Sequence, residues 1–428
     1  MQRTTAYFTI DNIDNFKWQM LNWANHFNVC CFLDSHHYTD SYQSWDCLLA
    51  AGACNIFSPK ENIFPQLKNF GSETNDWLFG HIGYDVKNEI EQLTSSNADH
   101  INFPDIFLFQ PITVIGIQKN KVIVSCINED PKKIYQSLLS SLPLRANTRK
   151  NNFLMRSRIS KADYIETIHR IRHHILRGDC YEINFCQEFF SDDVIISPLE
   201  IYHSLINISP SPFSCFYKLD DKYVLCASPE RYLKKKNNAI LSQPIKGTLK
   251  RAVNKTSDEL FKEALRNSEK DKSENVMVVD LVRNDLSKIC KKSSVKVKEL
   301  FGIYSFPQVH QMISTVSGEL KSNITFSEIL EATFPMGSMT GAPKKRVMEL
   351  IEQYECTKRG IFSGSIGYIT PQKDFDFNVV IRSIMYNAAS KYLSYQAGSA
   401  ITFKSDPYEE YKECLLKAKA IKKVLMGW

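Results

Sequence analysis

A lysine in a stiff segment is the first residue of this chain that suggests chemistry. Lys246 is the centre of residues 244–248, PIKGT, which follow the apolar run 239–241. Proline and glycine on either side restrict the backbone, so the amine should point in one fixed direction. A desolvated lysine can lose its proton and act as a nucleophile, whereas a lysine in an ordinary loop is only a solvated cation. Glu230, sixteen residues upstream in the turn 228–231, offers a carboxyl group to assist a leaving hydroxyl.

Two pairs of acidic residues recur at helical spacing. Asp271 and Glu274 are three residues apart, and so are Glu410 and Glu413. Residues at this spacing share one face of a helix. Two such pairs supply the oxygen ligands that Mg²⁺ prefers and leave positions for water and a substrate carboxylate. Either pair alone is more often a solvated acidic face. Lys417, one turn beyond Glu413, is a candidate for a second substrate anion.

Three further features are of the kinds found at binding sites. The turn 334–344 contains glycine and leads into a helix. Backbone N–H groups around Thr340 and Gly341 therefore predict an anion pocket, although an ordinary tight turn has the same composition. Arg382 lies in an apolar run and needs an anion, which is either a structural carboxylate or a substrate carboxylate. His310 also lies in a strand-like segment, where a lone histidine is usually a satisfied core residue.

The elements that must hold these residues follow from the apolar pattern. Helical spacing predicts helices over 161–177, 257–287, 343–355 and 407–425. Alternation and β-branched residues predict strands at 28–33, 112–117, 121–125 and 181–185. Asp406 and Pro407 are a typical helix start. Hairpins and helices mix without a repeating β-α-β order, so an α+β fold is favoured. The polar, basic stretch 142–153 predicts a connector between an N-terminal part, 1–150, and a larger C-terminal part, 151–428.

Composition argues against several classes of protein. The 428 residues are 43% hydrophobic and 23% charged, which is typical of a globular chain. No apolar stretch approaches the roughly 18 residues that span a bilayer, and the N-terminus lacks the layout of a secretory signal, so we expect a cytosolic protein. The twelve cysteines include no C-x-x-C pair and predict neither a disulfide framework nor a zinc site. A net charge of +6 without a basic tail gives little support to nucleic-acid binding.

Taken together, these segments resemble the chorismate-utilising enzymes. Motifs in the family's order extend over 160–425 and stand at 228–231, 244–248, 274–286, 337–344, 359–368, 381–382 and 405–407. Aminodeoxychorismate synthase component I carries lysine where this chain has Lys246, whereas anthranilate synthases carry alanine. The resemblance implies two large, mainly antiparallel β-sheets packed face to face with helices on the outside. It also implies that both parts of the chain pack as one compact unit.

The resemblance further implies a reaction. Chorismate would bind with its ring carboxylate on Mg²⁺, the implied cofactor. Lys246 would attack ring carbon 2 while Glu230 protonates the departing 4-hydroxyl, and ammonia would then add at carbon 4 and expel the lysine. The product, 4-amino-4-deoxychorismate, is a precursor of 4-aminobenzoate and folate. We expect a lowered pKa at the Lys246 amine, because it would be buried near the metal.

The remaining roles are implied in the same way. His310 would polarise or orient the substrate. The implied metal-site residues are Glu274, Glu410, Glu413 and, behind them, Asp271. The implied substrate-binding residues are Arg382, Tyr368, Thr340, Gly341, Gly398, Ser399 and Lys417. Residues 32–35 and 212–214 resemble the two walls of the family's tryptophan pocket, which predicts a pocket lined by Ser35, Pro212, Phe213 and Ser214. An ordinary core segment in which Trp45 fills that space is the alternative.

Three positions depart from the family's pattern. Glu182 stands where family members usually have glutamine, and where isochorismate and salicylate synthases use a lysine to activate water. A water-adding reaction is therefore disfavoured. Ala400 stands where glycine is usual, and Lys404 where an acidic residue is usual.

The sequence also bears on partners and on rival functions. No glutaminase signature is present, so ammonia should come from solution or from a separate glutamine amidotransferase subunit. The nearest rival function is anthranilate synthase component I. A rival of another class is a non-catalytic protein that senses tryptophan or chorismate. The full set of Lys246, Glu230 and four acids argues against such a sensor.

Overall fold

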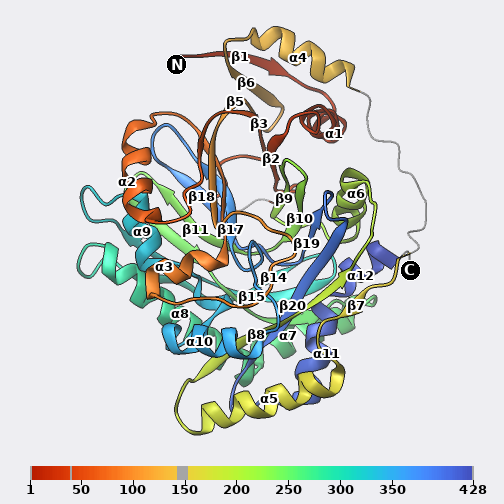
Figure 1. The fold of residues 1–428 in the computed structure, drawn as a ribbon, viewed down its shortest axis with the longest axis vertical. Coiled ribbons are helices and arrows are strands. Elements are labelled where there is room, and N and C mark those ends of the chain that lie inside the picture. Colours follow the sequence, from red (N-terminus) through yellow and green to blue (C-terminus); the bar gives the residue numbers. More distant parts are fainter. Residues whose placement is uncertain (1, 39–40, 142–152, 427–428) are drawn as a thin grey trace.

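The computed structural model describes residues 2–38, 41–141 and 153–426 and shows helices arranged around a network of β-strands (Figure 1). The predicted connector at 142–153 lies outside the described residues, apart from Phe153. The division near residue 150 therefore stays a prediction. Strands from both sides of it pair directly, since β2 (Val29–Asp34) pairs with β9 (Phe213–Leu219) and β4 (Leu78–Ile82) pairs with β17 (Ser365–Ile369).

All pairings between the named strands are antiparallel, which confirms the predicted α+β class. One layer of the network runs in the order β8 (Glu182–Ser191), β20 (Tyr392–Ile401), β19 (Ser383–Asn387), β10 (Lys222–Ser228), β9, β2, β3 (Cys47–Phe57) and β5 (Ile106–Gln118). The other runs β4, β17, β18 (Phe375–Asn378), β11 (Arg231–Lys236), β12 (Ala239–Gln243) and β15 (Val309–Glu319).

The two layers are continuous rather than separate, because β5 pairs with β3 of one layer and β4 of the other. Both β13 (Ile245–Lys250) and β14 (Lys296–Ser305) pair with β15. Shorter or peripheral strands complete the network: β1 (Arg3–Thr9), β6 (Lys121–Ile127), β7 (Arg156–Ser157) and β16 (Gly341–Ala342). The sequence resemblance implied two sheets, and the structure joins them at one long strand.

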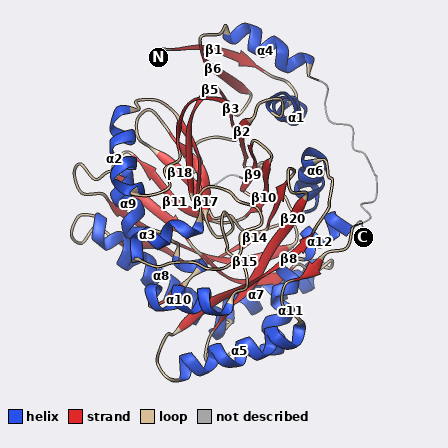
Figure 2. Ribbon diagram, viewed as in Figure 1, coloured by secondary structure: helices blue, strands red, loops and turns tan. Residues whose placement is uncertain are grey.

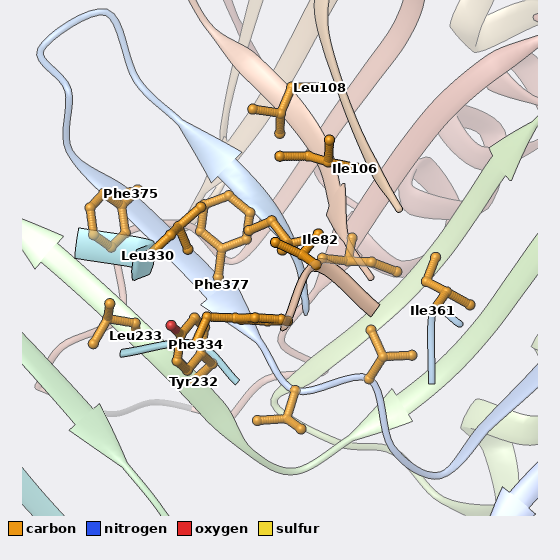
Figure 3. Packing of buried hydrophobic residues seen from close by; sticks show 14 of the residues in the cluster. Ile82, Ile106, Leu108, Tyr232, Leu233, Leu330, Phe334, Ile361, Phe375 and Phe377 are labelled. Carbon is orange, nitrogen blue, oxygen red and sulfur yellow. The ribbon is translucent and has the colours of Figure 1, made fainter. Parts of the chain in front are cut away.

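A hydrophobic core lies between the layers. Figure 3 shows part of it, and its labelled side chains include Ile106 of β5, Phe377 of β18 and Leu233 of β11, which belong to one cluster. A second core lies between the first layer and the outer helices. Strand β2 contributes Cys31 to the first core and its neighbours to the second, so both of its faces are buried. This explains why its sequence, VCCFLD, shows no polar alternation.

The helices lie mainly on the outside of the strands (Figure 2). Those away from the candidate site are α1 (Ile13–Ala24), α2 (Ile63–Glu73), α3 (Lys87–Glu91), α4 (Pro131–Ser140), α6 (Pro198–Ile208) and α9 (Phe326–Thr333). Two predicted helices are confirmed almost to the residue, as α5 (Lys161–Leu176) and α10 (Lys344–Tyr354). In the described part of the chain, no helix combines the length and the apolar character needed to cross a membrane.

The other two predicted helices are each divided. The segment 257–287 forms α7 (Lys255–Asn267) and α8 (Glu269–Ile289), because Ser268 leaves the helical conformation and its side chain caps α8 at the Asp271 N–H. The segment 407–425 forms α11 (Pro407–Lys417) and α12 (Lys419–Met426). Asp406 caps α11 as predicted, since its side chain accepts hydrogen bonds from two backbone N–H groups.

Candidate active site

One cavity gathers most of the residues that the sequence singled out. It lies where strands β8, β13 and β20 meet helices α8 and α11. The predicted residues that line it are Glu230, Lys246, Asp271, Glu274, Arg382, Gly398, Glu413 and Lys417. Residues that sequence reasoning did not single out also line it, among them Asn184, Lys270, Gln311, Ser338 and Gln396.

Lys246 is placed by an irregular strand rather than by a loop. Strand β13 carries it, and the pairing of β13 with β15 shifts register between Ile245 and Thr248. Gly247 has a φ of +90°, and a Cβ there would lie 3.0 Å from the Asp271 side chain. Glycine is therefore needed both for the backbone conformation and for the approach of α8. The bulge directs the Lys246 amine into the cavity wall, where the side chain is 7% exposed.

The pKa of Lys246 among the residues of this chain is raised, whereas the prediction was a lowered pKa beside a bound metal ion. Burial does lower this pKa, as expected, but the attraction of Glu182 followed by that of Glu274 and Glu230 outweighs burial, and the pKa is raised above its ordinary value. The Lys246 Nζ donates a short hydrogen bond to Glu182 Oε1. In the resting state the amine is thus a paired ammonium group.

Glu230 has the opposite character. It lies in the turn between β10 and β11 and is 4% exposed. Burial raises its pKa to about 7, although hydrogen bonding to Ser338 and the charge of Lys246 act against the shift. A carboxyl group that titrates near neutral pH can hold a proton and release it to a leaving group.

The four predicted metal-site acids lie on two helices, Asp271 and Glu274 on α8 and Glu410 and Glu413 on α11. Lys270 of α8 lies between them, with its Nζ 3.0 Å from Glu410 Oε1 and 3.9 Å from Glu274 Oε1. Burial raises the pKa of Glu274 to about 7. Glu413 pairs with Lys417 at 2.9 Å, and its pKa is lowered because this attraction outweighs burial.

These acids fit Mg²⁺ in chemistry. Glu410 Oε2 is buried without a hydrogen-bond partner, and so is Glu274 Oε1, which has only the distant Lys270 nearby. Carboxylate oxygens of this kind are the ligands that Mg²⁺ takes. Over the described ranges of the chain, no group of three histidine, cysteine or acidic side chains is already arranged to hold a metal ion. The magnesium site therefore stays a prediction.

Several predicted residues lie next to the cavity without lining it. His310 is 1% exposed, and its ring nitrogens contact Ser305 Oγ at 2.8 Å and Asp258 Oδ1 at 3.1 Å. Its neighbour Gln311 lines the cavity, and adjacent residues of a strand point to opposite faces. Ser399 is fully buried, and its Oγ lies 3.5 Å from the Glu410 carbonyl.

The glycine turn after α9 is paired through its backbone with the start of β8. The Asn184 N–H donates to the Thr340 carbonyl, and Gly341 pairs with Ile183. A Cβ on Gly341 would lie 2.0 Å from the carbonyl oxygen of Glu182, so only glycine allows this contact. Ser338 and Met339 of the same turn, rather than Thr340 and Gly341, line the cavity.

A second cavity gathers the residues of the predicted tryptophan pocket. Ser35, Pro212, Phe213 and Ser214 all line it. Trp45 forms part of its wall and leaves the cavity open, and Tyr368 lines this cavity rather than the first. Its partly buried Asp376 pairs with Arg231 at 2.9 Å and with Lys234 at 2.8 Å. Whether this cavity binds tryptophan stays a prediction.

The three unusual positions have different surroundings. Glu182 contacts Lys246, Ala400 lines the first cavity, and Lys404 is exposed.

The sequence contained a signal for one residue that we missed. Lys270 stands four residues before Glu274, a spacing that places the two on one helix face.

Comparisons with known proteins extend this description. Residues 31–423 match a family model described as chorismate binding enzyme. "Aminodeoxychorismate synthase component 1" of Klebsiella aerogenes is 33% identical over 80% of this chain and 75% of that protein. "Probable aminodeoxychorismate synthase, chloroplastic" of Oryza sativa is 35% identical over 81% of this chain, which spans only 43% of the rice protein. The solved structure of anthranilate synthase component I from Streptococcus pneumoniae superposes with a TM-score of 0.77 at 24% identity, covering 91% of this chain and 94% of that one.

Proposed function

The chain belongs to the chorismate binding enzyme family, and on that premise we propose that it converts chorismate and ammonia to 4-amino-4-deoxychorismate. One observation carries the proposal. A buried lysine and a buried carboxyl group with a pKa of about 7 line the same cavity, at Lys246 and Glu230. The first is a nucleophile and the second a general acid, which are the two groups that a covalent displacement of a hydroxyl requires.

The reaction divides one difficult substitution into two. Lys246 attacks ring carbon 2, and Glu230 gives its proton to the departing 4-hydroxyl. Ammonia then adds at carbon 4, and the lysine leaves. Each step needs a neutral nucleophile, so the proton on Lys246 must be removed before the attack.

The cavity also offers cations for a substrate with two carboxylates. Arg382 lines it with a φ of 51°, a left-handed conformation that is uncommon outside glycine. Its surroundings lower its pKa to about 10, so it is charged at neutral pH and suits the enolpyruvyl carboxylate. Lys417 contacts the Gly398 carbonyl at 3.1 Å on the opposite wall.

Mg²⁺ is the implied cofactor, held by Glu274, Glu410 and Glu413 with Asp271 nearby. When bound, it would neutralise these carboxylates and attract the ring carboxylate of chorismate. Lys270 would have to leave its position between Glu274 and Glu410.

We propose that a second protein is the main source of ammonia. The name of the Klebsiella relative includes the words "component 1", which supports a partner subunit. We place a glutamine amidotransferase in that role, with free ammonium as a slower substitute.

Anthranilate synthesis is the competing function. The Streptococcus protein, whose fold is similar, is an anthranilate synthase component I. Mass spectrometry of the products from chorismate, Mg²⁺ and ammonium separates the two. The amino product supports the proposal, whereas anthranilate and pyruvate would replace it with the competing function. Recovery of unchanged chorismate would contradict both.

A further inference from the structure

The amine of Lys246 has a carboxylate directly behind it. Lys246 lines the cavity, whereas Glu182 is 1% exposed and does not line it. The two side chains share a short hydrogen bond through Glu182 Oε1. The second oxygen, Glu182 Oε2, is buried without a hydrogen-bond partner. A ligand in the cavity can therefore contact Lys246, whereas Glu182 is closed to it.

Strand pairing holds the backbone of Glu182 in this position. Glu182 is the first residue of β8 and pairs with Ala342 of β16, at the close contact that requires Gly341. Asn184 and Cys186 follow on the same face of β8, and both line the cavity. The carboxylate thus belongs to the cavity's face of the strand but is covered by the lysine.

We propose that Glu182 is the positioning residue of Lys246 and accepts the proton that the amine loses before it attacks. The inference rests on the proposed function, because it takes Lys246 as the nucleophile. A buried carboxylate in hydrogen-bond contact can take this proton without an exchange with bulk water. The position of Glu182 behind the lysine also keeps it from activating a water molecule against the ring.

The protons balance over the whole cycle. One proton moves from Nζ to Glu182 and leaves a neutral amine. Its lone pair forms the bond to carbon 2, the ring double bonds shift, and the C4–O bond breaks as Glu230 supplies a proton, so that water leaves. Ammonia bonds to carbon 4, the double bonds shift back, and the C2–N bond breaks to return the neutral amine. Glu182 gives its proton back to Lys246, and Glu230 takes one from the new ammonium group.

The charges around the amine explain why an internal acceptor is needed. Glu182, Glu274 and Glu230 attract the proton on Lys246 and hold it there at neutral pH. Other charged groups line the same cavity: Lys270 and Asp271 from α8, Glu413 and Lys417 from α11, and Arg382 after β18. Loss of the proton to solvent would leave these carboxylates without their cation, whereas transfer to Glu182 keeps the net charge of the pair at zero.

The test is the rate at which chorismate forms a covalent adduct in the absence of ammonia, measured by mass spectrometry of quenched protein. Glu182→Gln should slow adduct formation about a hundredfold at neutral pH. The ratio of the variant rate to the wild-type rate should then rise about tenfold per pH unit between about pH 6 and pH 9, because the variant must lose its proton to water. The ratio removes the titration of Glu230, which both proteins share.

Two variants complete the comparison. Glu182→Asp keeps a carboxylate, so its rate ratio should stay flat with pH, and this variant decides the matter if Glu182→Gln does not fold. Glu188→Gln is the matched control, since Glu188 is a buried carboxylate of the same strand that pairs with Arg158 at 2.8 Å and does not line the cavity. It should form adduct at the wild-type rate. A Glu182→Gln ratio near one, or a lowered ratio that does not change with pH, would overturn the proposal.

A second readout separates this proposal from the proposed function. Competitive acetylation without chorismate reports how readily each lysine gives up its proton. The pH dependence of Lys246 acetylation should therefore differ between Glu182→Gln and the wild type. An unchanged acetylation profile would show that the pair does not control the amine, even if the enzyme makes the amino product. A changed acetylation profile together with no adduct in the wild type would contradict the covalent mechanism of the proposed function instead.

Discussion

Glu230→Gln offers a test of the acid's burial that does not depend on any substrate. A pKa of about 7 in place of the ordinary 4.5 means that the folded protein holds this proton more tightly than the unfolded chain does. Stability is therefore unaffected by the shift at pH values below 4.5 and falls as the pH rises through the range from 4.5 to 7. Above that range the ionised carboxylate remains buried, and its full cost persists.

The size of the cost follows from the shift. One pKa unit corresponds to about 1.4 kcal/mol, so the ionised Glu230 lowers the free energy of unfolding by about 3 kcal/mol. Glutamine has nearly the same shape and carries no charge. Glu230→Gln should therefore be more stable than the wild type by about 3 kcal/mol at about pH 9 and nearly equal to it at about pH 4.5.

Urea denaturation of both proteins at the two pH values, in the presence of a chelator, measures the difference. Glu269→Gln is the control, because Glu269 is the first residue of α8 and its side chain is 88% exposed. It should show no such dependence on pH. Turnover should meanwhile fall by about two to four orders of magnitude in Glu230→Gln, since the acid is lost. An equal stability difference at both pH values would refute the account of Glu230 as a buried acid.

Three other outcomes follow from the structure. Lys246→Ala should abolish the covalent adduct and slow formation of the amino product at least about a hundredfold, and undiminished turnover in a product assay would remove the covalent role. Glu274→Gln should weaken Mg²⁺ binding, measured by calorimetry, at least about tenfold, and unchanged affinity would exclude Glu274 as a ligand. Gly341→Ala should lower the free energy of unfolding by more than about 2 kcal/mol, because its Cβ would lie 2.0 Å from the Glu182 carbonyl; denaturation at the wild-type midpoint would contradict this contact.

Local patterns in the sequence were sufficient for elements that depend on near neighbours. The apolar spacing of α5 and the cap at Asp406 are short-range features, and both were predicted correctly. The break between α7 and α8 was missed, because Ser268 is compatible with a helix interior and only its cap at Asp271 shows the boundary. Alternation alone could not place His310, since the bulged pairing of β13 and β14 with β15 sets which side chain faces the cavity.

Long-range contacts explain the main errors at the site. The burial of Lys246 was expected from the family resemblance, and the structure agrees. The direction of its pKa shift depends on Glu182, which is 64 residues away in sequence and reaches the amine only through the pairing of β8. Tyr368 belongs to the family motif at 359–368 and was predicted to bind the substrate in the first cavity, yet it lines the second cavity.

An excess of carboxyl groups connects these observations. Six surround the first cavity, at Glu182, Glu230, Asp271, Glu274, Glu410 and Glu413, and four cations face them, at Lys246, Lys270, Arg382 and Lys417. Most of these acids are buried, so the shortage of positive charge must be met by protons or by a bound cation. Burial raises the pKa of two of the acids, Glu230 and Glu274, to about 7, and the neighbouring carboxylates make Lys246 hold its proton more tightly than a free lysine. Burial near a metal ion predicted a lowered pKa for Lys246, whereas the acids around the amine raise that pKa, and this is the reason for proposing that Glu182 takes its proton.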